Sequence, residues 1–241
     1  MGYALHRLSG KRALDGATKR KRVEWAREHS ARRAVWWRNR GYADAHYWYL
    51  PRSRAEAAGT ASTRAVYRKK GEGAQPKFHG GKGTGYKQGR KVGVWGVLTC
   101  EGLYVAFLPG GRVSGASHAK VVRRYYGRWA GSCQAVFHDG EKALHSPAAK
   151  AAYESVSLRC AKIPPYSPDM NPIENVWAML NVRLEGTKPG GWEREKAFRA
   201  RVRNAVAWIN ARRDGALTRM ISSMPRRVKA CVEAKGALTP Y

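Results

Sequence analysis

Three carboxylates in this chain stand where side chains could hold a divalent cation. Glu174 follows a proline-rich approach and falls on the first turn of an expected helix. Asp139 ends a short apolar run, 133–138, of the kind that forms a buried strand. Asp44 stands in the aromatic-rich run 42–50, which is typical of a half-buried strand. Carboxylates are hard oxygen ligands for cations such as Mg²⁺ or Mn²⁺, and such cations assist phosphoryl transfer.

Each of these carboxylates also has a purely structural interpretation. Asn171 is a good helix N-cap, and Glu174 three residues later is placed to reach back to the cap amide, which predicts a capping box. Asp139 with Gly140 is a strong turn signal. Asp44 could be an exposed strand acid. Local signals alone therefore leave the structural and cation-binding interpretations open.

Longer motifs add a resemblance to a known family. The block Tyr-Ser-Pro-Asp-Met-Asn-Pro-Ile-Glu-Asn-Val-Trp occupies 166–177, and 34 residues, 140–173, separate the second acid from the third. Both features resemble the catalytic domain of mariner-like transposases, members of the DDE superfamily of transposases and integrases. Further segments are similar to family motifs: Arg22 to His29, Val94-Trp95-Gly96, Ser223 to Arg227, and Lys235-Gly236.

The resemblance implies that Asp44, Asp139 and Glu174 are the first, second and third catalytic acids and the metal ligands. It implies phosphoryl transfer assisted by two Mg²⁺ (or Mn²⁺) ions, in which water cuts DNA at a transposon end and the freed 3′-hydroxyl joins that end to target DNA. The implied partner is DNA, at transposon ends and target sites, with a homodimer as a candidate assembly. The chain departs from the family in having Ala45 after the first acid and His145 six residues after the second.

The expected elements explain how distant acids could meet. Residues 1–40 are predicted to form a basic helical N-terminal extension, and 188–241 are predicted to form basic C-terminal helices. Between them, 41–187 have the element order of an α/β domain with a Gly-rich basic loop near 71–91. The predicted order is a strand at 42–50, a hairpin of 92–98 and 103–108, a helix near 117–128, a strand at 133–138, a helix at 146–155, a strand at 157–163 and a helix from Asn171. This order predicts an RNase H-like fold with a central mixed sheet and flanking helices, which the resemblance also implies.

Composition favours a polyanionic partner. The 241 residues include 46 Lys and Arg against 17 Asp and Glu, a formal net charge of +29, so DNA or RNA is the natural partner. A hydrophobic content of 43% with 9 tryptophans indicates a sizeable core. The sequence lacks an apolar run approaching the roughly 18 residues of a membrane span and an apolar signal region. We therefore expect an intracellular protein without a membrane partner, nuclear in a eukaryote and cytoplasmic otherwise.

The four cysteines are widely spaced and form no Cys-x-x-Cys pair. This spacing favours neither a zinc knuckle nor a disulfide framework, and predicts small apolar residues that are buried or partly buried. They are Cys100, Cys133, Cys160 and Cys231.

Members of the family that this chain resembles usually carry helix-turn-helix modules ahead of the catalytic domain. Residues 1–43 are too few for two such modules, so we expect a catalytic domain without them. Its DNA binding should be salt-sensitive and weakly selective for sequence, because phosphate contacts supply affinity while base contacts supply specificity. Two alternatives stay open: a non-catalytic nucleic-acid-binding relic or domesticated transposase derivative, and an RNase H-like nuclease acting on RNA.

Overall fold

A computed structural model describes residues 3–7, 14–51, 53–54, 65–69, 90–108, 113–129, 131, 133–140, 142–212 and 214–241. Its centre is a five-stranded sheet in the order β5-β4-β2-β6-β7. The strands are β2 (Arg40–Leu50), β4 (Arg90–Leu98), β5 (Leu103–Phe107), β6 (Ala135–His138) and β7 (Arg159–Lys162). The β5-β4-β2 half is antiparallel, whereas β6 and β7 run parallel to β2. The predicted mixed sheet is therefore confirmed.

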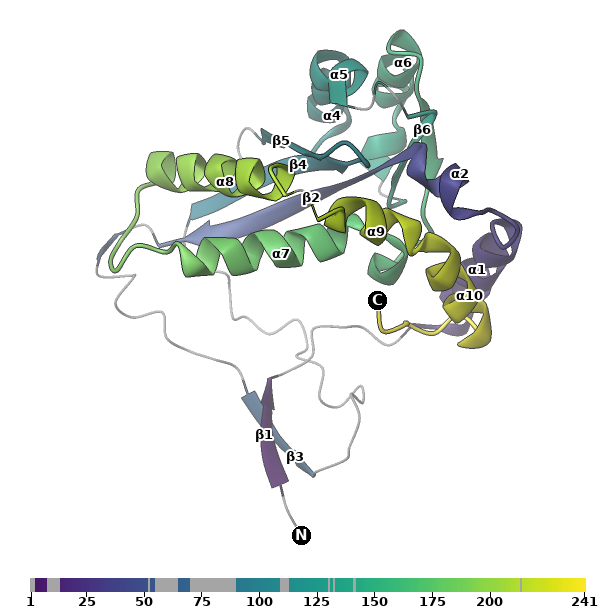
Figure 1. The fold of residues 1–241 in the computed structure, drawn as a ribbon, viewed down its shortest axis with the longest axis horizontal. Coiled ribbons are helices and arrows are strands. Elements are labelled where there is room, and N and C mark those ends of the chain that lie inside the picture. Colours follow the sequence, from purple (N-terminus) through teal and green to yellow (C-terminus); the bar gives the residue numbers. More distant parts are fainter. Residues whose placement is uncertain are drawn as a thin grey trace.

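Helices cover both faces of this sheet (Figure 1). One face carries α4 (Gly115–Val121), a π-helical turn (Val122–Tyr126), α5 (Gly127–Trp129) and α6 (Pro147–Ser155). The other side carries α1 (Gly16–Glu28), α2 (Ala34–Arg38), α7 (Ile173–Gly186), α8 (Glu195–Asn210), α9 (Ala216–Ser222) and α10 (Met224–Glu233). None of the helices in the described part of the chain is long and apolar enough to cross a membrane.

The alternation of side chains along β2 divides the core in two. Tyr42 packs in the core beneath α7, whereas Ala43 packs in the core beneath α4 and α6. Because side chains alternate along a strand, Asp44 returns to the α7 face. The central strand therefore presents its acid to the helix that carries Glu174.

Two expectations about the N-terminal half need correction. Residues Tyr3–Arg7 form strand β1, which pairs antiparallel with β3 (Ala65–Lys69), so the prediction that 1–40 are helical is wrong there. The reason is long-range pairing, which supplies these five residues with a backbone ladder that local helix propensity does not anticipate. Residues 71–89 of the predicted Gly-rich loop lie outside the described part of the chain, and Arg90 and Lys91 belong to β4.

Gly96 allows α7 to lie directly against the sheet. A Cβ atom at this position would lie 2.3 Å from Cη2 and 2.6 Å from Cζ2 of Trp177, which is itself buried. Any larger residue would therefore displace the indole. Since the strand register pairs Gly96 with Asp44, the close approach of Trp177 also fixes Glu174, one turn earlier, beside β2.

A buried ion pair holds the loop before α7. Arg22 of α1 donates to both carboxylate oxygens of Asp169, with Nη1–Oδ1 at 2.8 Å and Nη2–Oδ2 at 2.6 Å. The two side chains are 0% and 3% exposed. Asp169 belongs to the short 3₁₀ turn Pro168–Met170, so the pair ties α1 to the loop that leads to Glu174.

The C-terminal segment closes around the same carboxylate. Thr239 donates to Asp169 Oδ2 from both its backbone N–H and its hydroxyl, each at 2.9 Å. Arg22 Nε donates to Gly236 O at 2.8 Å, and Arg227 Nη1 donates to Asp169 O at 2.8 Å. Gly236 has a φ of 80°, and a Cβ there would lie 2.2 Å from Lys19 O. Three segments distant in sequence are thus joined at one carboxylate.

We expect Asp169→Asn to lower the free energy of unfolding by about 3–5 kcal/mol, because it leaves the guanidinium of Arg22 buried without its counter-ion. Urea titration at pH 7 measures this loss. The matched control is Glu185→Gln, which breaks an exposed pair with Lys188 (76% and 62% exposed) and should change the same quantity by less than about 1 kcal/mol.

The effect of Asp169→Asn should also depend on pH. Burial alone would raise the pKa of Asp169, but the hydrogen bonds and charge of Arg22, together with Thr239, lower that pKa below its usual value. A depressed pKa means that the pair stabilises the fold above the unfolded-state pKa and loses this contribution as pH falls through the folded-state pKa. The difference between parent and variant should shrink below about pH 4. Equal stabilities at pH 7 would contradict this account.

Candidate metal centre

The three predicted acids line one pocket of about 310 Å³. Asp44 comes from β2, Asp139 directly follows β6, and Glu174 lies on the first turn of α7. The parallel register pairs Tyr42 with Phe137, so the two aspartates, each two residues further on, stand level on neighbouring strands. Residues far apart in sequence are therefore brought together.

Asp44 and Glu174 are in direct contact through a hydrogen bond between their carboxyl groups. Burial, followed by the charges of Glu174 and Asp139, raises the pKa of Asp44 well above its usual value. Burial also raises the pKa of Glu174, with the charge of Asp139 adding to the rise and the hydrogen bond from Asp44 opposing it. The pair therefore binds its protons more tightly than two solvated carboxyls would.

The predicted capping box is wrong. The helix α7 begins at Ile173, its cap residue is Pro172, and the cap receives no side-chain hydrogen bond. Asn171 instead donates from Nδ2 to Ala43 O on β2, at 3.4 Å, and Glu174 contacts Asp44. The physical reason is burial of the loop against β2, where a tertiary partner replaces the local one.

The donor set fits a hard divalent cation. All three charged groups are carboxylates, and Asn171, which also lines the pocket, has a buried Oδ1 with no hydrogen-bond partner among the described residues. Oxygen ligands of this kind suit Mg²⁺ and Mn²⁺. A cation would also offset the crowded negative charge that raises the pKa of two of the acids.

Sequence reasoning missed the residues that hold this pocket in shape. It did not assign Asp169 or Asn171 any contact outside their own loop, although both are polar residues in a stretch rich in prolines. Both are buried, at 2% and 5% exposure. By strand alternation His46 shares the face of β2 with Asp44, but its ring stacks on Trp177 with the centroids 5.1 Å apart, and it does not line the pocket.

Comparison with known proteins identifies the family. Residues 58–189, more than half of the chain, match the family described as DDE superfamily endonuclease. The chain belongs to the DDE superfamily. The matched range contains Asp139 and Glu174 and begins after Asp44. The predicted membership in the DDE superfamily is thereby confirmed, and the family that the chain matches is one of endonucleases.

Two curated transposases are similar to this DDE domain. The transposable element Tcb1 transposase of Caenorhabditis briggsae is 27% identical over 224 residues, which cover 91% of this chain and 77% of that protein. The Tc1 transposase of Caenorhabditis elegans is 36% identical over 78 residues, which cover 32% of this chain and 26% of that protein.

Solved structures show the same fold. The Mos1 transposase catalytic domain with Raltegravir and Mg superposes with a TM-score of 0.65 at 14% identity, covering 95% of this chain and 100% of that one. The Mos1 paired-end complex with the left transposon end gives a TM-score of 0.67 at 16% identity, covering 94% of this chain and 65% of that one. The predicted RNase H-like fold is thus confirmed.

We expect Asp44→Asn to stabilise the protein when metal is removed. The change deletes one of the crowded charges while keeping a group that can hydrogen-bond to Glu174. In chelator at pH 7, the variant should melt about 3 °C or more above the parent, which corresponds to roughly 1 kcal/mol in a domain of this size. Differential scanning calorimetry measures the shift, and Glu154→Gln, an exposed acid on α6, is the control that should leave it unchanged.

The raised pKa of Asp44 explains why the melting temperature should rise in Asp44→Asn. A carboxyl whose folded-state pKa is raised binds more protons when folded, so the parent loses stability as pH rises from the unfolded-state pKa to the folded-state pKa. Asp44→Asn should lose less stability than the parent over this pH range. Mg²⁺ should raise the melting temperature of the parent and have little effect on Asp44→Asn. A variant less stable than the parent in chelator would count against this description of the pocket.

Proposed function

We propose that this chain cuts DNA strands and transfers them as the catalytic domain of a transposase, with Asp44, Asp139 and Glu174 as its catalytic acids. One observation carries the proposal: acids from three separate elements line one pocket, in which burial and neighbouring negative charge raise the pKa of Asp44 and of Glu174. Structural ion pairs do not produce this pattern, because they pair acids with bases. Membership in the DDE superfamily supports the same reaction class.

The acids would hold Mg²⁺ or Mn²⁺, which supply Lewis-acid assistance to phosphoryl transfer. The chain's own contribution is placement. Two neighbouring parallel strands hold the aspartates level, and Trp177 seated over Gly96 holds Glu174 against them. Asp44 and Glu174 would serve as ligands in their ionised forms, which a bound cation would favour. Asn171 would add an amide oxygen from the pocket wall.

DNA is the substrate that we propose. A net charge of +29 gives the chain a strong attraction for a phosphate backbone. Similar solved structures include a Mos1 paired-end complex with a transposon end and a Mos1 strand transfer complex, and others contain Mg or Mn. By analogy we propose that water cuts a transposon end, that the freed 3′-hydroxyl joins target DNA, and that a homodimer holds the two ends.

The test is strand cleavage by the purified chain, followed on gels with labelled DNA and RNA in Mg²⁺ or Mn²⁺. We expect Asp139→Asn and Glu174→Gln each to lower the rate at least about 100-fold, since even loss of an outer partner of a metal ligand costs 10–100-fold. Glu185→Gln, on the same helix as Glu174 but exposed, is the matched control and should retain activity.

The outcomes separate the proposal from its alternatives. Metal-dependent DNA cleavage that is lost when Asp139 or Glu174 is replaced supports it. Cleavage that survives replacement of Asp139 or Glu174 would sink the proposed mechanism. Tight DNA binding without cleavage by the parent chain favours the non-catalytic relic, and cleavage confined to RNA favours an RNase H-like nuclease.

A further inference from the structure

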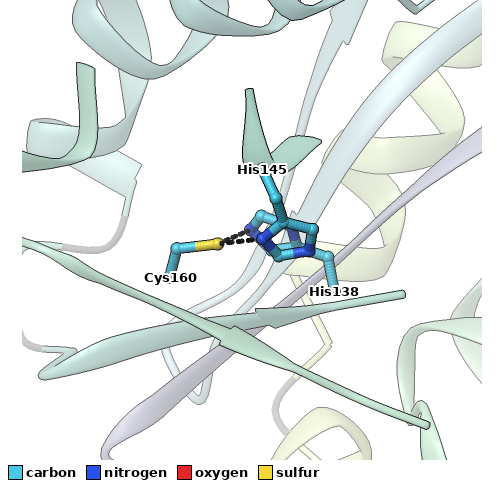
Figure 2. Close-up of side chains that lie close together, drawn as sticks. All are labelled: His138, His145 and Cys160. Carbon is cyan, nitrogen blue, oxygen red and sulfur yellow. Dashed lines mark hydrogen bonds between the residues drawn. The ribbon is translucent and has the colours of Figure 1, made fainter. Parts of the chain in front are cut away.

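A second cluster of side chains that can bind a metal lies on the face of the sheet opposite the acidic pocket. Figure 2 shows His138, His145 and Cys160 facing one another. They come from the end of β6, the 3₁₀ helix Lys142–His145 and strand β7. One potential ligand atom from each residue lies within 4.8 Å of the other two.

The spacing of these atoms matches tetrahedral zinc. Cys160 Sγ lies 3.3 Å from His145 Nδ1 and 3.8 Å from His138 Nε2. A tetrahedral Zn²⁺ with ordinary Zn–S and Zn–N bonds holds its sulfur and nitrogen ligands about 3.6 Å apart, a value that lies between these two distances. A thiolate with two imidazoles favours Zn²⁺ over the hard cations expected among carboxylates. We propose that His138, His145 and Cys160 form a zinc site.

The cluster is separate from the acidic pocket. Strand alternation turns His138 away from Asp139 and toward the core beneath α4 and α6, where Val136 also packs. None of the three residues lines the pocket of the acids. The zinc site and the catalytic pocket therefore occupy opposite faces of the sheet at the end of β6.

A backbone hydrogen bond supplies the outer contact that zinc-bound histidines normally make. With Nδ1 of His145 on the metal, its Nε2–H would donate to Asp139 O, which lies 3.2 Å away. His138 directly precedes Asp139 in the chain. The zinc would thus tie β6, β7 and the turn after Asp139 together, and its influence on catalysis rests on the function proposed above.

One polar group competes with the metal. The hydroxyl of Tyr153 hydrogen-bonds to His138 Nε2, the atom that would bind zinc. The same hydroxyl lies 3.3 Å from His118 Nε2, so it has a second partner when the metal takes the first. The thiol of Cys160 would give up its proton to solvent on binding. Both Cys160 and His145 are only partly buried, which leaves a path for the ion.

Cobalt substitution tests the site, because thiolate ligation gives Co²⁺ a charge-transfer absorption that carboxylates cannot produce. The purified full chain, stripped with chelator, is titrated with Co²⁺ in excess Mg²⁺, which occupies the acidic pocket. We expect one equivalent to produce the thiolate band and the visible bands of tetrahedral Co²⁺, and one equivalent of Zn²⁺ to abolish both. Cys160→Ser should remove the thiolate band and weaken Zn²⁺ binding about 100-fold, and His145→Gln should weaken it at least tenfold.

Cys100→Ser is the matched control, because Cys100 is also a partly buried free cysteine but lies outside the cluster. It should retain both the band and the affinity, and circular dichroism should show every variant folded. No thiolate band in the parent, a band that persists in Cys160→Ser, or a band lost in Cys100→Ser would overturn the proposal. Because the readout is thiolate ligation, absence of the zinc site would not contradict DNA cleavage by the acids. Absence of cleavage would likewise not contradict the zinc site.

Discussion

The buried ion pair between Arg22 and Asp169 is the constraint on which the rest of the structure depends. Burying two charges costs so much desolvation energy that the pair is tolerable only with its full set of hydrogen bonds. Here that set includes Thr239 and the carbonyl of Gly236, so the N-terminal helix, the loop before α7 and the C-terminus must assemble together. The segments that carry Arg22, Asp169 and Thr239 thus meet at one carboxylate. Their shared consequence is the position of Glu174.

The acidic pocket makes the opposite use of charge. At Asp169 a base neutralises the carboxylate and its pKa falls, whereas burial, with the charge of Asp139 adding to it, raises the pKa values of Asp44 and Glu174. The first arrangement stabilises the fold, whereas the second makes ionisation of Asp44 and Glu174 costly without a cation. Proteins retain such costs where function needs them. The Arg22–Asp169 pair and the close packing of Trp177 over Gly96 hold these acids in place.

Periodicity and turn chemistry were sufficient to predict the strands of the sheet and the helix α7, whereas the grouping of the three acids was predicted from the family resemblance. They failed where a distant partner decides. Asn171 has every local property of an N-cap, yet it bonds to Ala43, 128 positions earlier in the chain. Likewise Asp169 bonds to Arg22 across 147 positions, and β1 exists only because β3 pairs with it. Cys160, predicted to be a small apolar residue, lies beside two histidines because β7 pairs with β6. Local patterns carry no information about such partners.

The affinity of the acidic pocket for Mn²⁺ in the Asp169→Asn variant shows whether the Arg22–Asp169 pair positions Glu174. Asp169 does not line the pocket, so any effect must pass through the loop that it holds. Electron paramagnetic resonance of free Mn²⁺, at a temperature where circular dichroism shows the variant folded, gives the dissociation constant. We expect the variant to bind Mn²⁺ about 10–100-fold more weakly than the parent, as for loss of an outer partner of metal ligands. An unchanged dissociation constant in the folded variant would show that the Arg22–Asp169 pair does not position Glu174.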